Sequence, residues 1–246
     1  MSDLKNDRWP LSAAVFGATG GIGAALVWKL AERGAGTIYS GSRRGEGPEA
    51  AGVIPFRFDL TDEASIADAA DRMRANPPEL VIVATGVLTL ADGTGPERTY
   101  KRLDARAMGE VFALNTIGPA MIAKHVLPLL PRDRRAVFAA LSARVGSISD
   151  NGLGGWHSYR ASKAALNMLL KNLAIELGRT HEQAVVVGLH PGTVNSALSK
   201  PFQSGLPDGQ LTEPAEAAAN LLTVLDGLAP KQSGKVLDLK GEEIPA

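Results

Sequence analysis

Tyr159 and Lys163 lie in a segment whose apolar spacing predicts a helix over residues 158–177. Side chains four positions apart on a helix share one face. A phenol has an unperturbed pKa of about 10, and a neighbouring ammonium group lowers that pKa by stabilising the phenolate. The pair therefore has the chemistry to move a proton to or from an alcohol oxygen. Tyr-x-x-x-Lys alone is also common on protein surfaces, so the pair needs a supporting fold.

A glycine-rich turn supplies a second candidate site. It follows the apolar residues 11–16 and precedes a predicted helix over 22–34. Glycines allow the backbone to turn tightly and to approach a pyrophosphate, whose charge is favoured at a helix N-terminus. Because the turn stands between a strand and an amphipathic helix, we predict a dinucleotide site there. Its residues are Gly17, Thr19, Gly20, Gly21, Ile22 and Gly23.

The choice between NAD(H) and NADP(H) depends on the segment about twenty residues after this turn. An acidic residue there would accept hydrogen bonds from the adenosine ribose and favour NAD(H). The chain instead has Ser42, Arg43 and Arg44. A guanidinium suits a 2′-phosphate, so we predict NADP(H), held by Ser42 and Arg43. The alternative is that both arginines are solvated loop residues.

The elements that must position these residues alternate along the whole chain. Short apolar runs predict strands at residues 11–16, 36–39, 53–58, 80–84, 136–141, 184–189 and 236–239. Several are apolar on both faces, as strands of a covered parallel sheet are. Helical spacing predicts helices at 22–34, from a Thr61 cap to about 76, and at 103–130, 158–177 and 214–225. We therefore predict a single-domain, Rossmann-type doubly wound α/β fold of about seven parallel strands with helices on both faces.

One domain over residues 1–246 is expected, because no repeat or linker divides the chain. Residues 192–211 are long for a connection and form a candidate substrate loop. An ordinary surface excursion is the alternative.

Composition excludes several classes of function. Lys plus Arg equals Asp plus Glu at 26 each, so clustered positive charge for nucleic acid is not expected. Cysteine is absent and no two histidines stand four residues apart, so we expect no metal site. No apolar run approaches the ~18 residues of a membrane span, and residues 1–10 are polar. We expect a cytoplasmic protein with no membrane partner.

Taken together, the glycine turn, Asn115, the Tyr159/Lys163 pair and the Pro191-Gly192 step resemble the short-chain dehydrogenase/reductase family along nearly the whole chain. Segments 142–148, 150–151, 154–156 and 190–194 look like its C-factor-like, or sniffer-like, branch.

This resemblance implies roles for individual residues. Tyr159 would be the general acid or base, and Lys163 would lower its pKa and hold the nicotinamide ribose. Asn115 would hold a water that links Lys163 to solvent. The resemblance also implies cofactor contacts at Asp59, Leu60, Gly86, Pro191, Gly192, Thr193 and Val194. Without it, Asn115 reads as a mid-helix amide bonded to backbone, and Asp59 as a helix-entry residue.

The chain departs from the family pattern at three places. Phe16 replaces a threonine before the glycine turn, and the Asn-Asn-Ala-Gly segment after the fourth strand is replaced by residues 83–86. The serine that orients the substrate is replaced by Ala143. Ser142 is a candidate substitute, but adjacent strand residues point to opposite faces. Ser147, Ser149 and Thr193 are other hydroxyls near the expected pocket.

Two functions follow as hypotheses. The first is an NADP(H)-dependent oxidoreductase that transfers hydride between nicotinamide and a small carbonyl or alcohol substrate, in a homodimer or homotetramer. The second is a nucleotide-binding signalling or regulatory protein with little turnover, suggested by Ala143 and by the altered segment 83–86.

Overall fold

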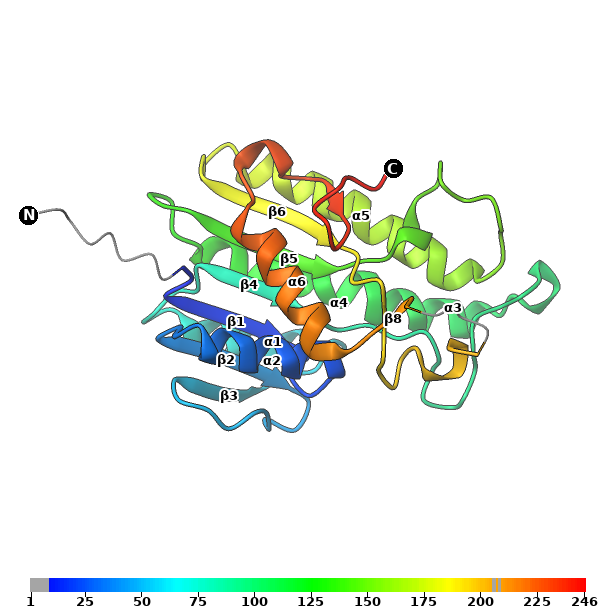
Figure 1. The fold of residues 1–246 in the computed structure, drawn as a ribbon, viewed down its shortest axis with the longest axis horizontal. Helices are drawn as coiled ribbons and strands as arrows, with labels where there is room; N and C mark the ends of the chain where they lie inside the picture. Colours follow the sequence, from blue (N-terminus) through cyan, green and yellow to red (C-terminus); the bar gives the residue numbers. More distant parts are fainter. Residues whose placement is uncertain (1–8, 205–206, 208) are drawn as a thin grey trace, which may run out of the picture.

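The computed structural model describes residues 9–204, 207 and 209–246, and the expectations for residues 1–8 and for positions 205, 206 and 208 of the substrate loop lie outside them. A seven-stranded parallel sheet runs through the molecule in the order β3-β2-β1-β4-β5-β6-β9 (Figure 1). Its strands are β1 (Ser12–Phe16), β2 (Thr37–Ser42), β3 (Val53–Arg57), β4 (Leu80–Val83), β5 (Ala136–Leu141), β6 (Ala184–Leu189) and β9 (Val236–Leu237). The predicted doubly wound fold is confirmed.

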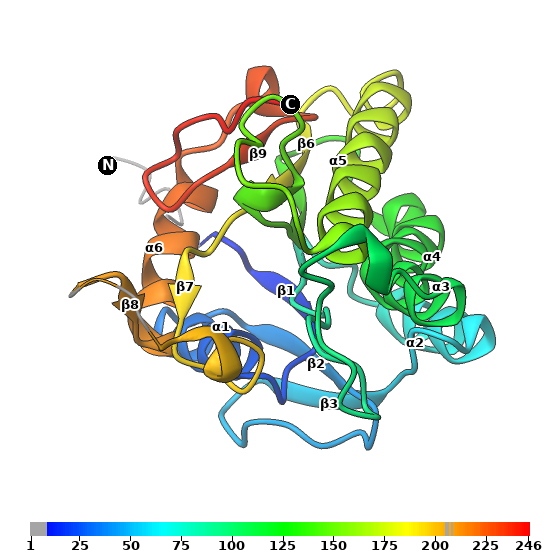
Figure 2. The ribbon, with the colours of Figure 1, turned by 90° about the vertical axis from the view of Figure 1, so that its right-hand side faces the viewer.

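Helices cover both faces of this sheet (Figure 2). One apolar core joins the sheet to α1 and α6, and a second joins the opposite face to α2, α4 and α5. The helices are α1 (Gly21–Glu32), α2 (Glu63–Met73), α3 (Ala105–Phe112), α4 (Gly118–Val126), α5 (His157–Leu177) and α6 (Pro214–Asp226). Short 3₁₀ turns lie at Tyr100–Arg102, Leu127–Leu129, Arg144–Gly146, Lys200–Phe202 and Pro230–Gln232.

The strand order reverses between β1 and β4. In open parallel sheets, ligands bind beyond the carboxyl ends of the strands at such a reversal. The glycine turn follows β1 and the segment containing Gly86 follows β4, so both lie at this edge.

The long helix predicted over 103–130 is instead divided. α3 begins after Asp104, whose carboxylate accepts a hydrogen bond from Ala107 N at 2.8 Å. It gives way to a π-helical turn, Ala113–Ile117, before α4 begins. Pro119 explains the change, because it has no N–H to donate to the carbonyl four residues back, at Asn115. Wider turns of this kind are frequent at functional sites.

The N-cap of the second helix lies one residue later in the chain than the predicted Thr61. Asp62 caps α2 by accepting a hydrogen bond from Ser65 N. Thr61 instead donates its hydroxyl to Asp59 Oδ1 at 2.7 Å. α2 ends at Met73, three residues earlier than predicted.

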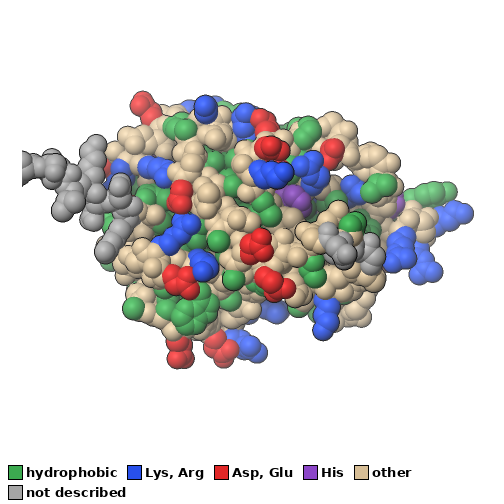
Figure 3. Space-filling view, viewed as in Figure 1, with side chains coloured by type: hydrophobic (Ala, Val, Ile, Leu, Met, Phe, Trp, Pro, Cys, Tyr) green, Lys and Arg blue, Asp and Glu red, His purple; other side chains and the backbone are tan. Residues whose placement is uncertain are grey.

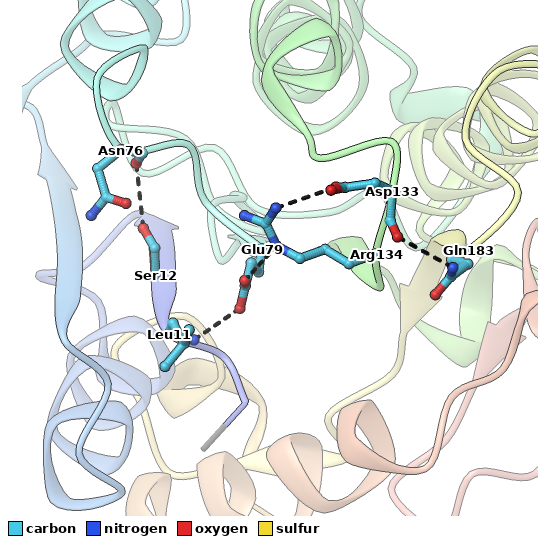
Figure 4. A network of polar contacts seen from close by, with 7 residues as sticks. All are labelled: Leu11, Ser12, Asn76, Glu79, Asp133, Arg134 and Gln183. Carbon is cyan, nitrogen blue, oxygen red and sulfur yellow. Dashed lines mark hydrogen bonds and ion pairs between the residues drawn. The ribbon is translucent and has the colours of Figure 1, made fainter. Parts of the chain in front are cut away.

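A buried carboxylate joins the segments at the amino ends of the parallel strands (Figure 4). Glu79, only 5% exposed, accepts hydrogen bonds from Leu11 N and from Arg134 Nε, both at 2.9 Å. Arg134 continues to Asp133, whose carbonyl accepts a bond from Gln183. The network joins the residues that precede β1, β4, β5 and β6, far from the glycine turn.

Glu79→Ala is expected to destabilise the fold. The substitution leaves the Leu11 N–H without its acceptor, whereas Arg134, at 53% exposed, can be solvated. We expect the free energy of unfolding to fall by about 1–2 kcal/mol, measured by urea denaturation. The matched control is Asp133→Ala, which removes an 81%-exposed carboxylate and should change stability by less than about 1 kcal/mol. Equal losses of unfolding free energy in the two variants would show that the buried hydrogen bonds of Glu79 stabilise the fold no more than the exposed carboxylate of Asp133 does.

Charged side chains are dispersed on the face that α1 and α6 cover, where acidic and basic groups alternate (Figure 3). Within the part of the chain that the structure describes, no helix is long and apolar enough to cross a membrane. Nor do the described residues contain a cluster of metal-ligating side chains.

Candidate active site

The glycine turn is fixed by close backbone approaches. Gly17 has φ +94°, and its N–H and that of Ala18 both donate to the carbonyl of Gly41 at the end of β2. A β-carbon on Gly23 would lie 2.1 Å from the Gly17 carbonyl oxygen. Only glycine lets α1 start this close to the end of β1.

The N-terminus of α1 is suited to an anion. Its N-cap is Gly20, which makes no side-chain capping bond, whereas Asp62 and Asp104 cap α2 and α3. The first N–H groups of a helix lack intrahelical partners and favour negative charge. Thr19, Gly20 and Gly21 are exposed here. The turn therefore fits a pyrophosphate, as the sequence predicts.

The end of β2 presents an exposed arginine. The Ser42 hydroxyl accepts a bond from Glu46 N at 2.9 Å and donates to the Glu46 carbonyl at 2.6 Å, so it shapes the turn that carries Arg43. Arg44 pairs with the Glu46 carboxylate, with both groups exposed. Arg43 remains accessible at the predicted 2′-phosphate position.

Asp59 lies close to this arginine. Its pKa is held below the usual value by the hydrogen bonds from Thr61, with smaller contributions from Arg43 and Arg57. The adjoining Leu60 packs so closely on α4 that a β-carbon on Gly118 would lie 2.7 Å from its Cδ2. Asp59 is half-buried at the edge of the sheet where the adenosine is expected. Leu60, a predicted cofactor contact, packs against α4 in this structure.

Phe16 explains the first departure from the family pattern. Its ring is fully buried and packs edge-on against Phe56 and Phe58, with centroid distances of 5.2 and 5.0 Å. The ring of Phe56 also fills the space beside Gly41, where a β-carbon would lie 2.3 Å from a ring atom. The larger residue at position 16 is thus accommodated in the core beneath the turn.

Tyr159 and Lys163 are buried together in the first two turns of α5. The Lys163 Nζ atom donates to the carbonyl of Leu141, at the end of β5, at 2.8 Å, and lies 5.9 Å from the centre of the Tyr159 ring. A β-carbon on Gly86 would lie 3.5 Å from this Nζ and 3.2 Å from Oδ1 of Asn115. The structure therefore brings Tyr159, Lys163, Asn115 and Gly86 to one place.

Burial dominates the ionisation of the pair. It raises the pKa of Tyr159 to about 12 and lowers the pKa of Lys163 to about 8, because desolvation disfavours the charged form of each group. The sequence predicted a lowered pKa for Tyr159. In this structure the Lys163 ammonium is directed to the Leu141 carbonyl, and desolvation outweighs its charge.

Asn115 connects three elements. Its Oδ1 accepts the N–H of Val87 at 2.8 Å, and its Nδ2 donates to the Val87 carbonyl at 2.9 Å and to the Ser162 hydroxyl at 3.2 Å. Ser162 in turn donates to the Tyr159 carbonyl. The amide thus braces the segment after β4, where the family's own amides are replaced, against the turn of α5 that carries Tyr159.

Ser142 does not join this group. Its hydroxyl donates to Oδ1 of Asn167 at 2.6 Å, which corrects its candidacy as the substrate-orienting residue. The cause is the strand-like alternation of neighbouring side chains. Ala143 is the residue directed to the site, where it packs with Leu88 and Tyr159.

The segment after β6 closes the site from the other side. Val194 and Thr193 form β7 (Thr193–Val194), which pairs with β8 (Leu211–Thr212) and joins the two ends of the candidate substrate loop. Pro191 is buried and Gly192 has φ +71°. A β-carbon on Gly21 would lie 3.2 Å from Cβ of Ser196, so this loop lies over the start of α1.

Aromatic and apolar side chains surround Tyr159. The Trp156 ring lies 6.2 Å from the Tyr159 ring and 5.2 Å from that of Phe202. The same cluster contains Leu88, Ala143 and Val145. The Tyr159 ring therefore has apolar neighbours on one side and Lys163 on another.

Sequence reasoning missed three residues of the site: Glu97, Ser158 and Ser162. Glu97 contacts Ser158 from a loop 61 positions away, a separation with no periodic signal. Ser162 was visible beside Lys163, but its bonds to Asn115 and Tyr159 require the packed helices.

The seven-stranded parallel sheet with helices on both faces and a glycine turn before α1 defines a Rossmann-type α/β protein. The sequence model of the short chain dehydrogenase family matches residues 12–206. The chain therefore belongs to the short-chain dehydrogenase family of oxidoreductases.

Two curated relatives are similar over much of the chain. The C-signal protein of Myxococcus xanthus is 36% identical over 143 residues, which cover 58% of this chain and 81% of that protein. A 1-hydroxy-2-glutathionyl-2-methyl-3-butene dehydrogenase of Rhodococcus sp. (strain AD45) is 33% identical over 224 residues, covering 90% of this chain and 93% of the relative.

Solved structures share the fold. An NADPH-bound carbonyl reductase from chicken fatty liver superimposes with a TM-score of 0.81 at 26% identity, covering 96% of this chain and 94% of its own. The carbonyl reductase Sniffer of D. melanogaster has a TM-score of 0.80 at 20% identity, covering 96% and 99%. The second likeness concerns the fold alone.

Proposed function

We propose that this protein is an NADP(H)-dependent reductase of small carbonyl compounds, with Tyr159 as the proton donor. The observation that carries the proposal is the burial of Tyr159 and Lys163 beside Gly86, at the carboxyl edge of the sheet and next to an uncapped helix N-terminus. The NADPH-bound carbonyl reductase relative supports the assignment.

NADPH would supply the hydride when bound, and this chain's residues do the rest. The glycine turn and the start of α1 would hold the pyrophosphate. Asp59 lies where the adenosine is expected, and Gly86, Pro191, Gly192, Thr193 and Val194 line the nicotinamide end in this proposal. The apolar cluster around Trp156 excludes water from the carbonyl, and the Tyr159 hydroxyl donates a proton to its oxygen.

Lys163 and Asn115 would support that proton transfer. Since burial raises the pKa of Tyr159 to about 12 in this structure, the phenol holds its proton at neutral pH, and donation requires that the phenolate be stabilised. Once the proton has left, the ammonium of Lys163 stabilises the phenolate. Asn115 fixes the segment after β4 and, through Ser162, the backbone at Tyr159.

Cofactor choice gives a direct prediction. Arg43→Ala should weaken NADPH affinity about 10- to 100-fold, because hydrogen bonds to charged groups contribute about 1.5–3 kcal/mol. NADH affinity should stay nearly unchanged, since NADH carries no 2′-phosphate. Fluorescence titration with both nucleotides measures this. The matched control is Arg132→Ala, an exposed arginine just before β5 at the opposite edge. Equal losses for both nucleotides, or none, would contradict the role of Arg43.

The reaction itself is tested by following NADPH consumption, with NADH in parallel, against a panel of aldehydes and ketones. We expect consumption of NADPH with at least one carbonyl class. An NADPH-binding protein that consumes it with no member of the panel would contradict the proposal.

A second function, nucleotide-dependent signalling with little turnover, is favoured by one observation. Ala143 places no hydroxyl beside Tyr159, and Ser142 is bonded elsewhere. A lost donor of this kind typically slows catalysis by ~10²–10³-fold. The likeness to the C-signal protein gives this function a precedent by name. A biological role that persists when Tyr159 is replaced by Phe would favour it.

Association into a homodimer or homotetramer is also part of the proposal. Exposed apolar side chains on the π-helical turn and α5 support it: Ile117 at 53%, Met168 at 61% and Ile175 at 53% exposed. Packing of these helices across a two-fold axis would bury them.

A further inference from the structure

One residue of the loop between β4 and α3 is bonded to the start of α5. Glu97 Oε2 accepts the backbone N–H of Ser158 at 3.1 Å, and Oε1 accepts the Ser158 hydroxyl. The Glu97 carbonyl also accepts the N–H of Trp156 at 2.5 Å. Three hydrogen bonds from a single loop residue therefore hold the chain immediately before Tyr159.

The start of α5 depends on such a partner. Its N-cap is Trp156, whose side chain makes no capping bond. Trp156 has φ +48°, a left-handed conformation that is uncommon for a residue with a side chain. A carboxylate that accepts first-turn N–H groups stabilises a helix at this end. Glu97 provides from the loop what the local sequence lacks.

The same loop lies beside Tyr159. Glu97 and Tyr159 line one small cavity, together with Leu88, Pro96 and Ser158. Burial opposes ionisation of Glu97, but the hydrogen bonds from Ser158 hold its pKa below the ordinary value. The carboxylate is thus charged at neutral pH and acts as an acceptor.

We propose that Glu97 is a positioning residue for Tyr159: by bonding Ser158 and Trp156, it fixes the first turn of α5 and sets the phenol against the substrate. The inference rests on the proposed function, in which Tyr159 donates the proton. A displacement of about 1 Å at a reacting group can slow turnover by as much as 10²-fold, so the contact matters for rate more than for binding.

The test compares Glu97→Ala with Glu97→Gln, and adds Ser158→Ala, which removes one bond from the other side. In Glu97→Ala we expect kcat to fall at least ~10-fold, with the KM for NADPH within ~2-fold of the unsubstituted value. Glu97→Gln keeps an acceptor oxygen and should recover most of the loss. Glu182→Ala, an exposed residue before β6, is the matched control and should leave both constants unchanged.

Hydrogen exchange supplies a second readout that does not require turnover. The Ser158 amide should exchange at least ~10-fold faster in Glu97→Ala, because its acceptor is gone. An unchanged kcat, or a rise in substrate KM at unchanged kcat, would overturn the positioning role and leave Glu97 a loop anchor. If the unsubstituted protein turns over no carbonyl, the proposed function fails, and unchanged exchange at Ser158 would separately overturn the inference.

Discussion

Tyr159→Phe should lower kcat by about 10²–10⁴-fold, the range of general acid catalysis by a single side chain. The substitution removes only the hydroxyl, so the ring keeps its packing against Trp156. NADPH affinity should change by less than about tenfold, the effect of one hydrogen bond. Initial rates of NADPH oxidation and a fluorescence titration with NADPH measure the two effects.

Tyr100→Phe is the matched control, because this tyrosine is 68% exposed. It should leave both kcat and NADPH affinity unchanged. Turnover of Tyr159→Phe within about tenfold of the unsubstituted rate would contradict the assignment of Tyr159 as the proton donor. Parallel loss of NADPH binding and turnover would point to a cofactor-binding role instead.

Lys163→Met should abolish most turnover and change how stability depends on pH. The pKa of Lys163 is about 8 in the folded protein, against 10.5 for the free side chain. Below pH 8 both states bind the proton, and the full cost of burying the charge opposes folding. Between these two pKa values the unfolded chain holds more protons, so the stability of the unsubstituted protein rises with pH.

The variant lacks this titration. The unsubstituted protein should therefore gain about 3 kcal/mol of unfolding free energy relative to Lys163→Met between pH 7 and about 10.5. Loss of the hydrogen bond to the Leu141 carbonyl changes the difference in unfolding free energy between the two proteins by the same amount at every pH. The informative quantity is therefore the slope of that difference against pH. Urea denaturation across the pH series measures it.

Lys171→Met serves as the control, since Lys171 is exposed on the same helix. Its stability difference from the unsubstituted protein should be independent of pH. A pH-independent difference for Lys163→Met as well would show that the Lys163 ammonium is not desolvated in the folded protein.

The fold could be predicted from the sequence because the patterns that indicate its strands and helices are periodic and local. Strands apolar on both faces, such as β4 and β6, predict a covered parallel sheet. Strand–helix alternation then restricts the topology to the doubly wound form. The order β3-β2-β1-β4-β5-β6-β9 follows that form.

The division of the predicted helix over 103–130 had a sequence signal that the apolar periodicity concealed. Pro119 lies inside the periodic pattern and removes the N–H that would bond Asn115. The result is the π-helical turn that places Asn115 against Val87 and Ser162. Pro119 is therefore a stronger indication of where the helix is interrupted than the apolar periodicity is of its continuation.

The site was predictable where one residue type is required by backbone geometry. Gly17 and Gly23 are demanded by the tight start of α1. The ionisation of Tyr159 was not predictable, because desolvation depends on how completely Trp156 and Leu88 enclose it. The contact of Glu97 with the start of α5 was not predictable for a similar reason, since its partner Ser158 is 61 residues away in the sequence.

The most direct test of the proposed reaction is transfer of deuterium from NADPH labelled at nicotinamide C4, with both labelled faces supplied separately. Mass spectrometry of the product alcohol reads the label. We expect one labelled form to deliver a single deuterium to the former carbonyl carbon, and Tyr159→Phe to suppress the transfer. Bound NADPH that delivers no deuterium to any carbonyl of the panel, from either face, would contradict the assignment of this protein as a reductase.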